Sequence, residues 1–591
     1  MGPRWKRSAI TMSLALAAAA FAGASGVSAQ QRDPNDPRIG LRAGWKDAGV
    51  AASNMELLAS TPRPEGFFDP NALGNILLAN SDLAFQGSNL FLGNFNGFQI
   101  HDISDPENPK LRTAVVCPGG QGDVSVWGNL LFMSVEMPNG RIDCAEGTFT
   151  DSVSTERFLG VRIFDISDIA NPKQVGAVQT CRGSHTHTLV PDPNDASHVY
   201  IYVSGTSAVR SPTELPGCSG LPPEQDPNTA YFRIEVIEVP LANPEQARIV
   251  NSPRIFADEQ TGDIAGLWRG GAHGTGTQET ATTDQCHDIT VYPELGLAAG
   301  ACSGNGILLD ISDPANPRRV EEVVDPNFAY WHSATFSNAG DKVIFTDEWG
   351  GGMAPRCLAS DKPEWGANAI FSIENNELVL GSYYKLPAPQ TGTENCVAHN
   401  GSLVPVPGRD IMVQAWYQGG ISVFDFTDVK NPVEIAFFDR GPYEENQLQL
   451  GGHWSAYWYN GHIYGSEIGR GLDVLALKPS EHLTQNELDA AKLAHLERFN
   501  PQTQPRFTWP AHFTVARAYI DQLQRNPAMQ TEATRIARDL DRAERLSAQE
   551  RRDALNQLAS SIDPILAATQ GPDARRLEGL AQTLRGLASG S

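Results

Sequence analysis

Seven copies of one β-rich phrase, and a change to helical pattern after Pro479, predict a mainly β protein. The expected fold is a seven-bladed β-propeller with a small all-α C-terminal bundle. Repeats of several short strands are typical of propeller blades, because each unit is a four-stranded sheet. At 591 residues the chain is too long for one ordinary core, which agrees with a large repeat domain plus a second unit.

The clearest copies of the phrase end in a turn of the type Asp-Ile-Ser-Asp-Pro-x-Asn-Pro. They span residues 98–109, 161–172, 307–317 and 421–432. Degenerate copies begin at Phe232, Ala369 and Leu472. In the clear copies an apolar strand closes on prolines, which end a strand because proline lacks an N–H donor and has a fixed φ. We therefore expect the propeller to cover residues 71–478.

The N-terminus has the pattern of a secretory signal peptide. Basic residues precede a short apolar stretch, and small residues ending at Ala29 follow, so residues 1–29 are expected to be removed. A membrane span needs about 20 apolar residues, and the mature chain is expected to contain none. We expect an exported protein, periplasmic, cell-surface or extracellular, in which residues 30–70 form an extended arm.

Charge and cysteine usage narrow the function classes. The formal net charge of −24 disfavours nucleic acid and anionic lipid as partners, because binding of phosphates depends on a basic surface. The eight cysteines are an even number, and disulfides are the default in an exported chain. Sequence does not fix their connectivity. Adjacency favours the pairs 117–144, 181–218, 286–302 and 357–396.

After Pro479 the composition shifts toward alanine, leucine, glutamate, arginine and glutamine, and residues 479–591 are expected to form a helical domain. Thr484 and Glu487 have the spacing of a capping box that opens a helix. A second helix is indicated by helical spacing of apolar residues from Phe513 to Leu523. Further helices are expected at 529–545, 547–567 and 572–588.

Five of the 13 histidines open similar segments of the repeat. They are His185, His287, His332, His399 and His453. Each follows the closing turn of one copy and starts the first strand of the next blade, which lines the channel of a propeller. The same position of each repeat therefore meets at one channel mouth, with His187 two residues deeper.

Acidic and aromatic residues lie on loops that return to the same mouth. The acids are Glu136, Asp347, Glu348 and Glu467, and the aromatic walls are Trp349, Trp416 and Tyr417. Imidazole and carboxylate together suit a divalent metal, with copper favoured and zinc or iron as alternatives. In this interpretation the metal ligands come from the six histidines named above, and Glu348 or Glu467 moves protons. The competing interpretation is a water-filled channel that is lined by polar side chains for that reason alone.

The repeated phrase resembles the LVIVD-repeat family of exported bacterial and archaeal proteins over roughly residues 70–478. The resemblance implies a propeller and says little about activity. The histidine-lined mouth is also similar in outline to the propellers of the selenium-binding protein and methanethiol oxidase family. That likeness implies copper-dependent thiol oxidation, and it rests on the repeated channel histidines alone.

Two functions remain open from the sequence. The first is a metal-dependent oxidase or hydrolase that acts on a small-molecule substrate. The second is a non-catalytic periplasmic or cell-surface propeller that binds protein or glycan. A metal that co-purifies and a channel mouth open to solvent would favour the first function.

Overall fold

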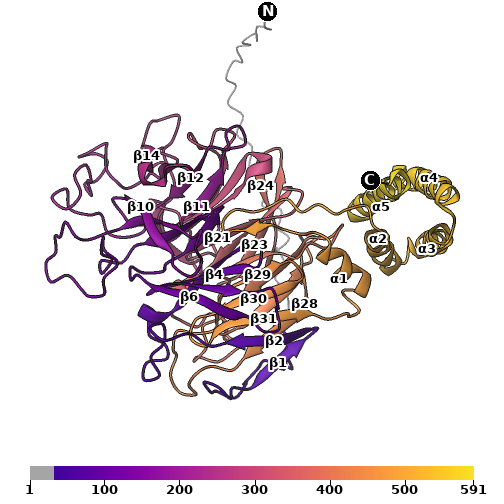
Figure 1. Cartoon of the computed structure of the whole chain (residues 1–591), viewed down its shortest axis with the longest axis horizontal. Coiled ribbons are helices and arrows are strands. Elements are labelled where there is room, and N and C mark those ends of the chain that lie inside the picture. The colour runs from indigo at the N-terminus through magenta and orange to yellow at the C-terminus, as the bar shows by residue number, and fades with distance from the viewer. Residues whose placement is uncertain (1–31, 591) are drawn as a thin grey trace, which may run out of the picture.

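The computed structural model describes residues 32–590, so the expected signal peptide lies outside the described residues. The chain has a propeller fold: many small sheets form one body, and helices stand to one side of it (Figure 1).

The first half of the body consists of three sheets of consecutive antiparallel strands and a separate hairpin. The first sheet contains β3 (Asn80–Gln86), β4 (Asn89–Asn94), β5 (Gly97–Asp102), β6 (Lys110–Val116) and the short β32 (Arg498–Phe499). The second contains β7 (Val124–Trp127), β8 (Leu130–Val135), β9 (Gly160–Asp165) and β10 (Lys173–Gln179). The third contains β11 (Thr188–Pro191), β12 (His198–Val203), β13 (Glu235–Pro240) and β14 (Arg248–Asn251). The hairpin is β15 (Arg269–Ala272) and β16 (Glu279–Thr282).

The second half contains two further four-stranded sheets and one sheet of nine strands. One four-stranded sheet contains β17 (Asp288–Tyr292), β18 (Leu297–Cys302), β19 (Asn305–Asp310) and β20 (Arg318–Val323). The other contains β21 (Trp331–Phe336), β22 (Lys342–Asp347), β23 (Asn368–Glu374) and β24 (Glu377–Tyr384). The nine-stranded sheet runs in the order β1 (Val50–Ser53), β28 (Val433–Arg440), β27 (Ile421–Asp425), β26 (Ile411–Ala415), β25 (Asn400–Leu403), β29 (His453–Tyr459), β30 (His462–Glu467), β31 (Gly471–Leu477), β2 (Met55–Thr61).

The first strands of these units lie side by side in a ring. β3 contacts both β7 and β29, β17 contacts β11 and β21, and β21 contacts β25. β25 and β29 are joined by a short parallel pairing, which is why two units count as one nine-stranded sheet. The remaining neighbours, β7 and β11, are linked by a side-chain hydrogen bond between Ser125 on β7 and His187, the residue before β11.

Residues from the N-terminal region complete the last two units. β2 pairs antiparallel with β31 from Met55 opposite Leu477 to Thr61 opposite Leu472. β1 pairs with β28. The region predicted as an extended arm therefore contributes outer strands to the sheets, and the two ends of the β body are joined by backbone hydrogen bonds.

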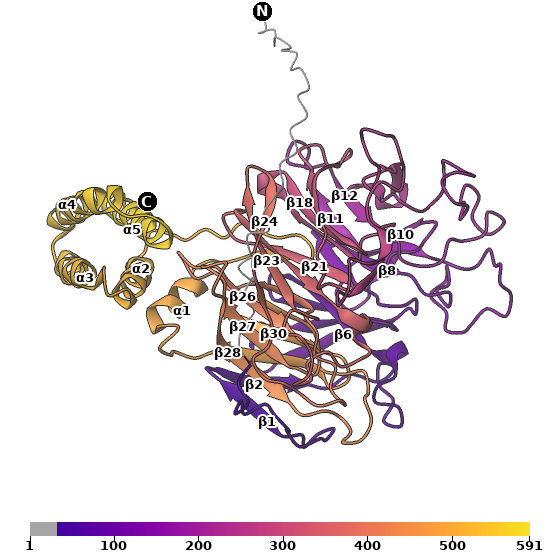
Figure 2. The same ribbon diagram turned by 180° about the vertical axis from the view of Figure 1, so that it is seen from behind.

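The helices follow the expected pattern. They are α1 (Gln485–Lys492), α2 (Phe513–Arg525), α3 (Gln530–Glu544), α4 (Ala548–Ala567) and α5 (Pro572–Ser589). The capping box at Thr484 and Glu487 is present and opens α1. Apolar faces of α2 to α5 pack on one another around Ile536, Leu555 and Leu577, and these helices lie beside the propeller in both views (Figure 2).

The segment between α1 and α2, residues 498–509, runs across the far ends of the first strands. We call it the crossing segment. Asn500 bonds to the backbone of Val126 on β7, and the Thr503 hydroxyl donates to the Leu189 carbonyl on β11. Its next bonds are to Val291 on β17 and Phe336 on β21. Since β32 at its start also pairs with β3, the crossing segment ties together at least five units at the end of the ring away from the five histidines.

Four disulfides are present, and they are the four pairs that adjacency predicted: Cys117–Cys144, Cys181–Cys218, Cys286–Cys302 and Cys357–Cys396. Disulfides of this number fit an exported protein. None of the helices within residues 32–590 combines the length and the apolar character that a membrane crossing requires.

We predict that Gln504→Leu destabilises the propeller. The Gln504 amide accepts from the Phe336 N–H at 2.8 Å and donates to the Phe336 carbonyl at 2.9 Å. Leucine leaves both buried backbone groups unpaired, which costs about 1–3 kcal/mol for each group. The midpoint of thermal unfolding should fall clearly, while Gln582→Leu on the exposed face of α5 should leave it unchanged. An equal midpoint for both variants would contradict a stabilising role for the crossing segment.

Candidate metal centre

Four of the five repeat histidines lie next to one another at the mouth of the ring. His185 precedes β11, His287 immediately precedes β17, His332 is the second residue of β21, and His399 immediately precedes β25. Ring centroids are 4.4 Å apart for His185 and His287, 3.9 Å for His287 and His332, and 4.1 Å for His332 and His399. We call this row of rings the histidine arc.

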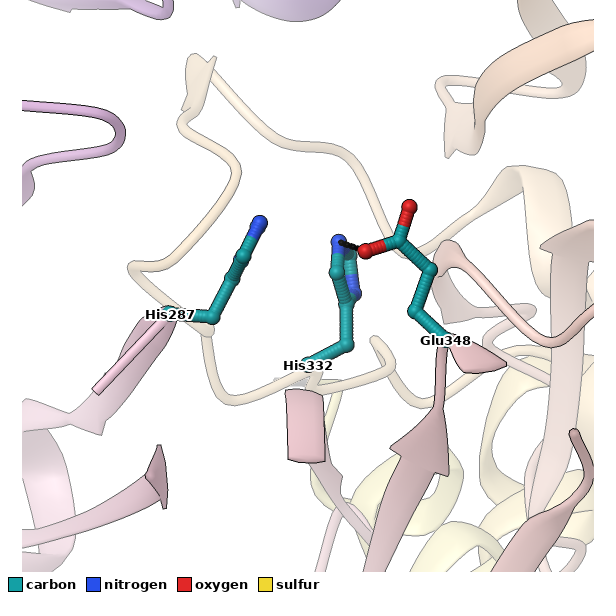
Figure 3. A group of neighbouring side chains, drawn as sticks. All are labelled: His287, His332 and Glu348. Carbon is teal, nitrogen blue, oxygen red and sulfur yellow. Dashed lines mark ion pairs between the residues drawn. The ribbon is translucent and has the colours of Figure 1, made fainter. Parts of the chain in front are cut away.

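Three side chains of this region form a group that could hold a metal ion. One ligand atom from each of His287, His332 and Glu348 lies within 4.8 Å of the others, and all three residues are buried. The His287 and His332 side chains extend side by side, and the Glu348 carboxylate lies against the His332 ring (Figure 3). They come from the residue before β17, from β21 and from the loop after β22. The distance from His332 Nε2 to Glu348 Oε2 is 3.7 Å, and from His399 Nε2 to Glu348 Oε1 it is 3.8 Å.

Local backbone features aim these side chains inward. The pairing of β21 with β22 shifts register between Trp331 and Ala334, so His332 lies in a bulge, a feature that re-aims a side chain. The Cys286–Cys302 disulfide joins the residue before His287 to the end of β18.

Glu348 is followed by a glycine-rich turn that brings it close to Tyr417. Gly352 has a φ of 67°, and a Cβ at this position would overlap the Tyr417 ring. Tyr417 itself has a φ of 51°, a left-handed conformation that is rare for a bulky residue. Its hydroxyl donates a short hydrogen bond to Glu348 Oε1. Glycine and a strained tyrosine thus fix the carboxylate against the arc.

The arc contains buried nitrogen atoms without hydrogen-bond partners. Neither ring nitrogen of His332 is hydrogen-bonded within the described part of the chain, and Nε2 of His399 is likewise unpaired. Both residues are fully buried. Because an unsatisfied buried polar group costs about 1–3 kcal/mol, such atoms need an explanation. A metal ion bound by these nitrogens supplies one.

The electrostatics of the arc keep its central imidazoles neutral. Burial, aided by the neighbouring histidines, lowers the pKa of His332 well below its ordinary value and that of His399 to about 3. A neutral imidazole is the form that binds a metal. Burial raises the pKa of Glu348 to about 7, although its bond from Tyr417 acts the other way. A cation beside Glu348 would favour the carboxylate.

Outer contacts orient two of the rings. His287 Nδ1 lies 2.9 Å from Asp288 Oδ1, and His399 Nδ1 donates to the Trp454 carbonyl. Such contacts leave the Nε2 atom of each ring free, as is common for histidines that bind metals. His287 and His399 therefore present the same nitrogen toward the centre.

A cavity of about 650 Å³ opens beside the triad. His185, His287, Glu348, Tyr330 and Trp454 are part of its lining. His185 is paired with Glu136, its Nδ1 lying 2.6 Å from Glu136 Oε2. Burial acts to lower the pKa of His185, but the Glu136 carboxylate raises it above its ordinary value. The triad therefore adjoins both open space and a charged pair that can exchange a proton.

The other predicted site residues lie elsewhere. His187 bonds to the hydroxyls of Ser125 and Ser134 at 2.6 Å and 2.8 Å. His453 lies against Asp473 at 2.9 Å. Glu467 accepts from the Tyr443 hydroxyl at 2.8 Å and from Arg470 at 3.0 Å. These three are held by their own partners and do not join the triad.

Of the other loop residues predicted around the mouth, Glu136 and Tyr417 contact arc residues, as described above. Asp347 is buried and accepts from the backbone N–H groups of Ala329, Tyr330 and Gly366, so it holds neighbouring loops together. Arg356 covers the Trp349 ring, and Trp416 is fully buried in the adjoining core.

Sequence reasoning missed Tyr330 and Asp288, which adjoin the arc. Tyr330 comes two residues before His332, and its ring is 5.7 Å from that of His287. Asp288 comes directly after His287. Both neighbour a repeat histidine in sequence, so residues flanking those histidines would have been a usable signal.

Below the arc, the inner strands carry three fully buried carboxyl groups, Asp82, Asp123 and Asp288. Asp82 accepts from Ser455 at 2.7 Å and from Asn400 at 3.0 Å. Burial, with some help from Asp288, raises the pKa of Asp82 to about 6. Burial and the charges of Asp82 and Asp288 raise the pKa of Asp123 well above its ordinary value. Ionisation is thus unfavourable at Asp82 and Asp123, whereas burial of Asp288 is outweighed by the neighbouring His287, which lowers the pKa of Asp288.

Comparison with known proteins supports the repeat. Residues 80–116 match the LVIVD repeat model, and this segment is the span from β3 to β6. The chain therefore carries an LVIVD repeat, as its sequence predicted, and the matched repeat is one four-stranded unit. No curated protein matches the chain.

Several solved structures are similar over most of their length. A putative 6-phosphogluconolactonase from Bacteroides uniformis is 10% identical, with 65% of this chain and 88% of that chain covered, at a TM-score of 0.36. A periplasmic gluconolactonase from Pseudomonas aeruginosa is 10% identical, with 67% and 97% covered, at 0.40. Hydrazine synthase from Kuenenia stuttgartiensis is 12% identical, with 66% and 92% covered, at 0.39. Likenesses at these TM-scores carry no weight for the function of this chain.

We predict that Asp82→Asn removes one contribution to stability that is lost as the pH rises. Burial raises the pKa of Asp82 to about 6, whereas the ordinary pKa is 3.8. In that interval Asp82 binds more protons in the folded state than in the unfolded chain, so its own contribution to the free energy of unfolding falls as pH rises, by up to about 3 kcal/mol. Asparagine is neutral throughout.

Denaturant unfolding of both proteins between about pH 4 and about pH 7 measures this difference. As the pH rises over this range, the variant should become more stable relative to the wild type, because only the contribution of Asp82 differs between the two proteins. A difference in stability that stays constant over the range would show that Asp82 does not resist ionisation. Asp105→Asn, in the exposed loop after β5, serves as the control.

Proposed function

We propose that the protein is an exported seven-bladed propeller that binds a divalent metal ion at the histidine arc. The seven blades are β3–β6, β7–β10, β11–β14, β17–β20, β21–β24, β25–β28, and β29–β31 completed by β2. The parallel pair between β25 and β29 then marks a boundary between blades rather than the interior of one sheet. Residues 71–478 form the propeller with help from β2, and residues 479–591 form the helical domain.

The observation that carries the proposal is the triad of His287, His332 and Glu348 with the unpaired nitrogens beside it. We assign these three as ligands and His399 as a fourth, because its free Nε2 faces the same carboxylate. Two or three imidazoles with one carboxylate suit copper(II), zinc or iron, and we favour copper.

The proposed reaction is oxidation or hydrolysis of a small substrate. A bound metal of this kind polarises an oxygen atom or a water molecule, or exchanges electrons with a substrate. His287 and Glu348 face the cavity, so a substrate can approach from that side. The pair of His185 and Glu136 is placed to accept or return a proton at His185 Nε2. Tyr330 and Trp454 restrict the size of what enters.

We predict that the purified protein contains near-stoichiometric metal and that His332→Ala loses it. His332 is the central ring of the arc, and removing a ligand from a site of this size typically lowers affinity by about tenfold or more. Elemental analysis of protein from an exporting host measures the effect. His495→Ala, at an exposed position outside the propeller, is the matched control. Metal-free wild-type protein that also fails to reload would overturn the proposal.

The same measurement of metal content should distinguish Glu348 from Glu467, the two acids that the sequence predicts as proton carriers. Glu348→Gln should lower the metal content, because an amide is a poorer ligand and the bond from Tyr417 becomes weaker. Glu467→Gln should leave it unchanged, since Glu467 is bonded to Tyr443 and Arg470. Far-ultraviolet circular dichroism confirms that both variants are folded.

We predict that metal-loaded protein either consumes oxygen with a small thiol or cleaves a small ester or lactone, and that His332→Ala does neither. Oxygen uptake detects the oxidase, and proton release detects the hydrolase. A protein that binds metal stoichiometrically but is inert in both screens would instead favour a non-catalytic propeller that binds protein or glycan.

A further inference from the structure

A second cavity, of about 360 Å³, lies between the N-terminal region and the last blades. Its lining comes from residues 45–50, from Arg63 and Phe68 after β2, from Arg440 at the end of β28, and from the turn at 469–470. None of its lining residues lines the cavity at the metal centre. We propose that this pocket binds a small organic carboxylate with an aromatic body, and that Arg63 pairs with the carboxylate.

Within residues 32–590, Arg63 is a buried cation without an ion-pair partner. The residue is 7% exposed, and only its Nη1 is hydrogen-bonded, to the Leu78 carbonyl at 2.6 Å. Nε and Nη2 are buried without a hydrogen-bond partner in the described part of the chain. Two adjacent N–H groups of one guanidinium are the donors that grip a carboxylate in bidentate fashion.

Two of the other positive groups at the pocket are already engaged, and the third, Lys46, is exposed to solvent. Arg440 forms a two-point ion pair with Asp473, at 2.8 Å and 3.1 Å. Arg470 pairs with Glu467 and donates to the carbonyls of Gly44, Trp45 and Gly441. The charge of Glu467 acts on Arg63 and favours its protonated form, but the Glu467 carboxylate is already bonded to Arg470 and to Tyr443. Arg63 is therefore the buried cation left for a ligand.

Energetics favour an anion here. An isolated buried charge is costly unless it is paired, and burial already lowers the pKa of Arg63. Arg440 and Arg470 add positive potential around it. In a chain with a net charge of −24, a pocket of this sign is a local exception.

The walls of the pocket favour an aromatic body. Trp45 and Phe68 lie nearly parallel, with ring centroids 5.8 Å apart and planes 9° apart. Ala48, Val50 and Pro62 supply the remaining apolar surface. The Arg63 guanidinium is 5.2 Å from the Phe68 ring, so a carboxylate on Arg63 places its substituent beside the aromatic rings. The cavity is large enough for one ring with substituents.

Benzoate and its neutral analogue benzamide test the proposal on the full-length protein by isothermal titration calorimetry. Benzoate should bind at millimolar concentration or below, and benzamide should bind at least about tenfold more weakly, because it lacks the charge that pairs with Arg63. Arg63→Met should weaken benzoate by a similar factor. Arg248→Met, at an exposed position on β14, should have no effect.

The inference is overturned if benzoate does not bind, if benzamide binds as well as benzoate, or if Arg63→Met binds benzoate unchanged. The comparison of benzoate with benzamide needs only the wild-type protein, so it decides the question even if Arg63→Met fails to fold. Chloride and inorganic phosphate, titrated in the same way, should bind more weakly than benzoate. Equal binding would show a general anion site without aromatic selectivity.

Discussion

Closure of the ring is the constraint on which the rest of the structure depends. Because β2 pairs with β31, and β29 contacts β3, the last unit cannot turn away from the first. A closed ring brings the start of each first strand to one mouth, and only there do residues as distant in sequence as His185 and His399 come together. Neither the metal triad nor its cavity would exist in an open array of the same repeats. The N-terminal strands therefore matter to the site although they contribute no residue to it.

Burial supports the proposal of a metal at the arc over a water-filled lining. A polar channel satisfies its groups with water, but His332 is enclosed by two other imidazoles, Glu348 and the surrounding strands. The rings of His287 and His399 cannot donate a hydrogen bond to it, since each already uses its Nδ1–H, for Asp288 and for a backbone carbonyl, and presents a lone pair at Nε2. A cation at the centre satisfies several of these atoms at once. The same low polarity that makes an unpaired nitrogen costly strengthens each ligand bond.

The repeat phrase, the helices after Pro479 and the disulfide pairs were predictable from sequence, because each depends on local patterns. Which histidines belong to the arc was only partly predictable from sequence. His453 starts its strand as His287 does, but the pairing of β29 with β30 shifts register there, and Asp473, which pairs with Arg440, holds the ring. Glu467 lies on an equivalent loop, yet Arg470 three residues later draws it away. The position of a residue in the repeat determines its blade and its height along the channel. The direction of its side chain depends on partners that come from other strands.

The crossing segment connects the helical C-terminal region to the chemistry at the opposite mouth. Gln502 donates to Asp288 at 3.3 Å, and Asp288 in turn lies 2.9 Å from the Nδ1 atom of His287. The backbone of the same segment bonds to Val291, near the far end of β17. One strand thus carries a proposed metal ligand at its start, the residue that orients that ligand next to it, and the attachment of the crossing segment at its other end. Since this segment also crosses the far side of the ring, the open side of the triad is the cavity beside His185. The helices that follow the segment are anchored to β17, the strand that begins directly after His287.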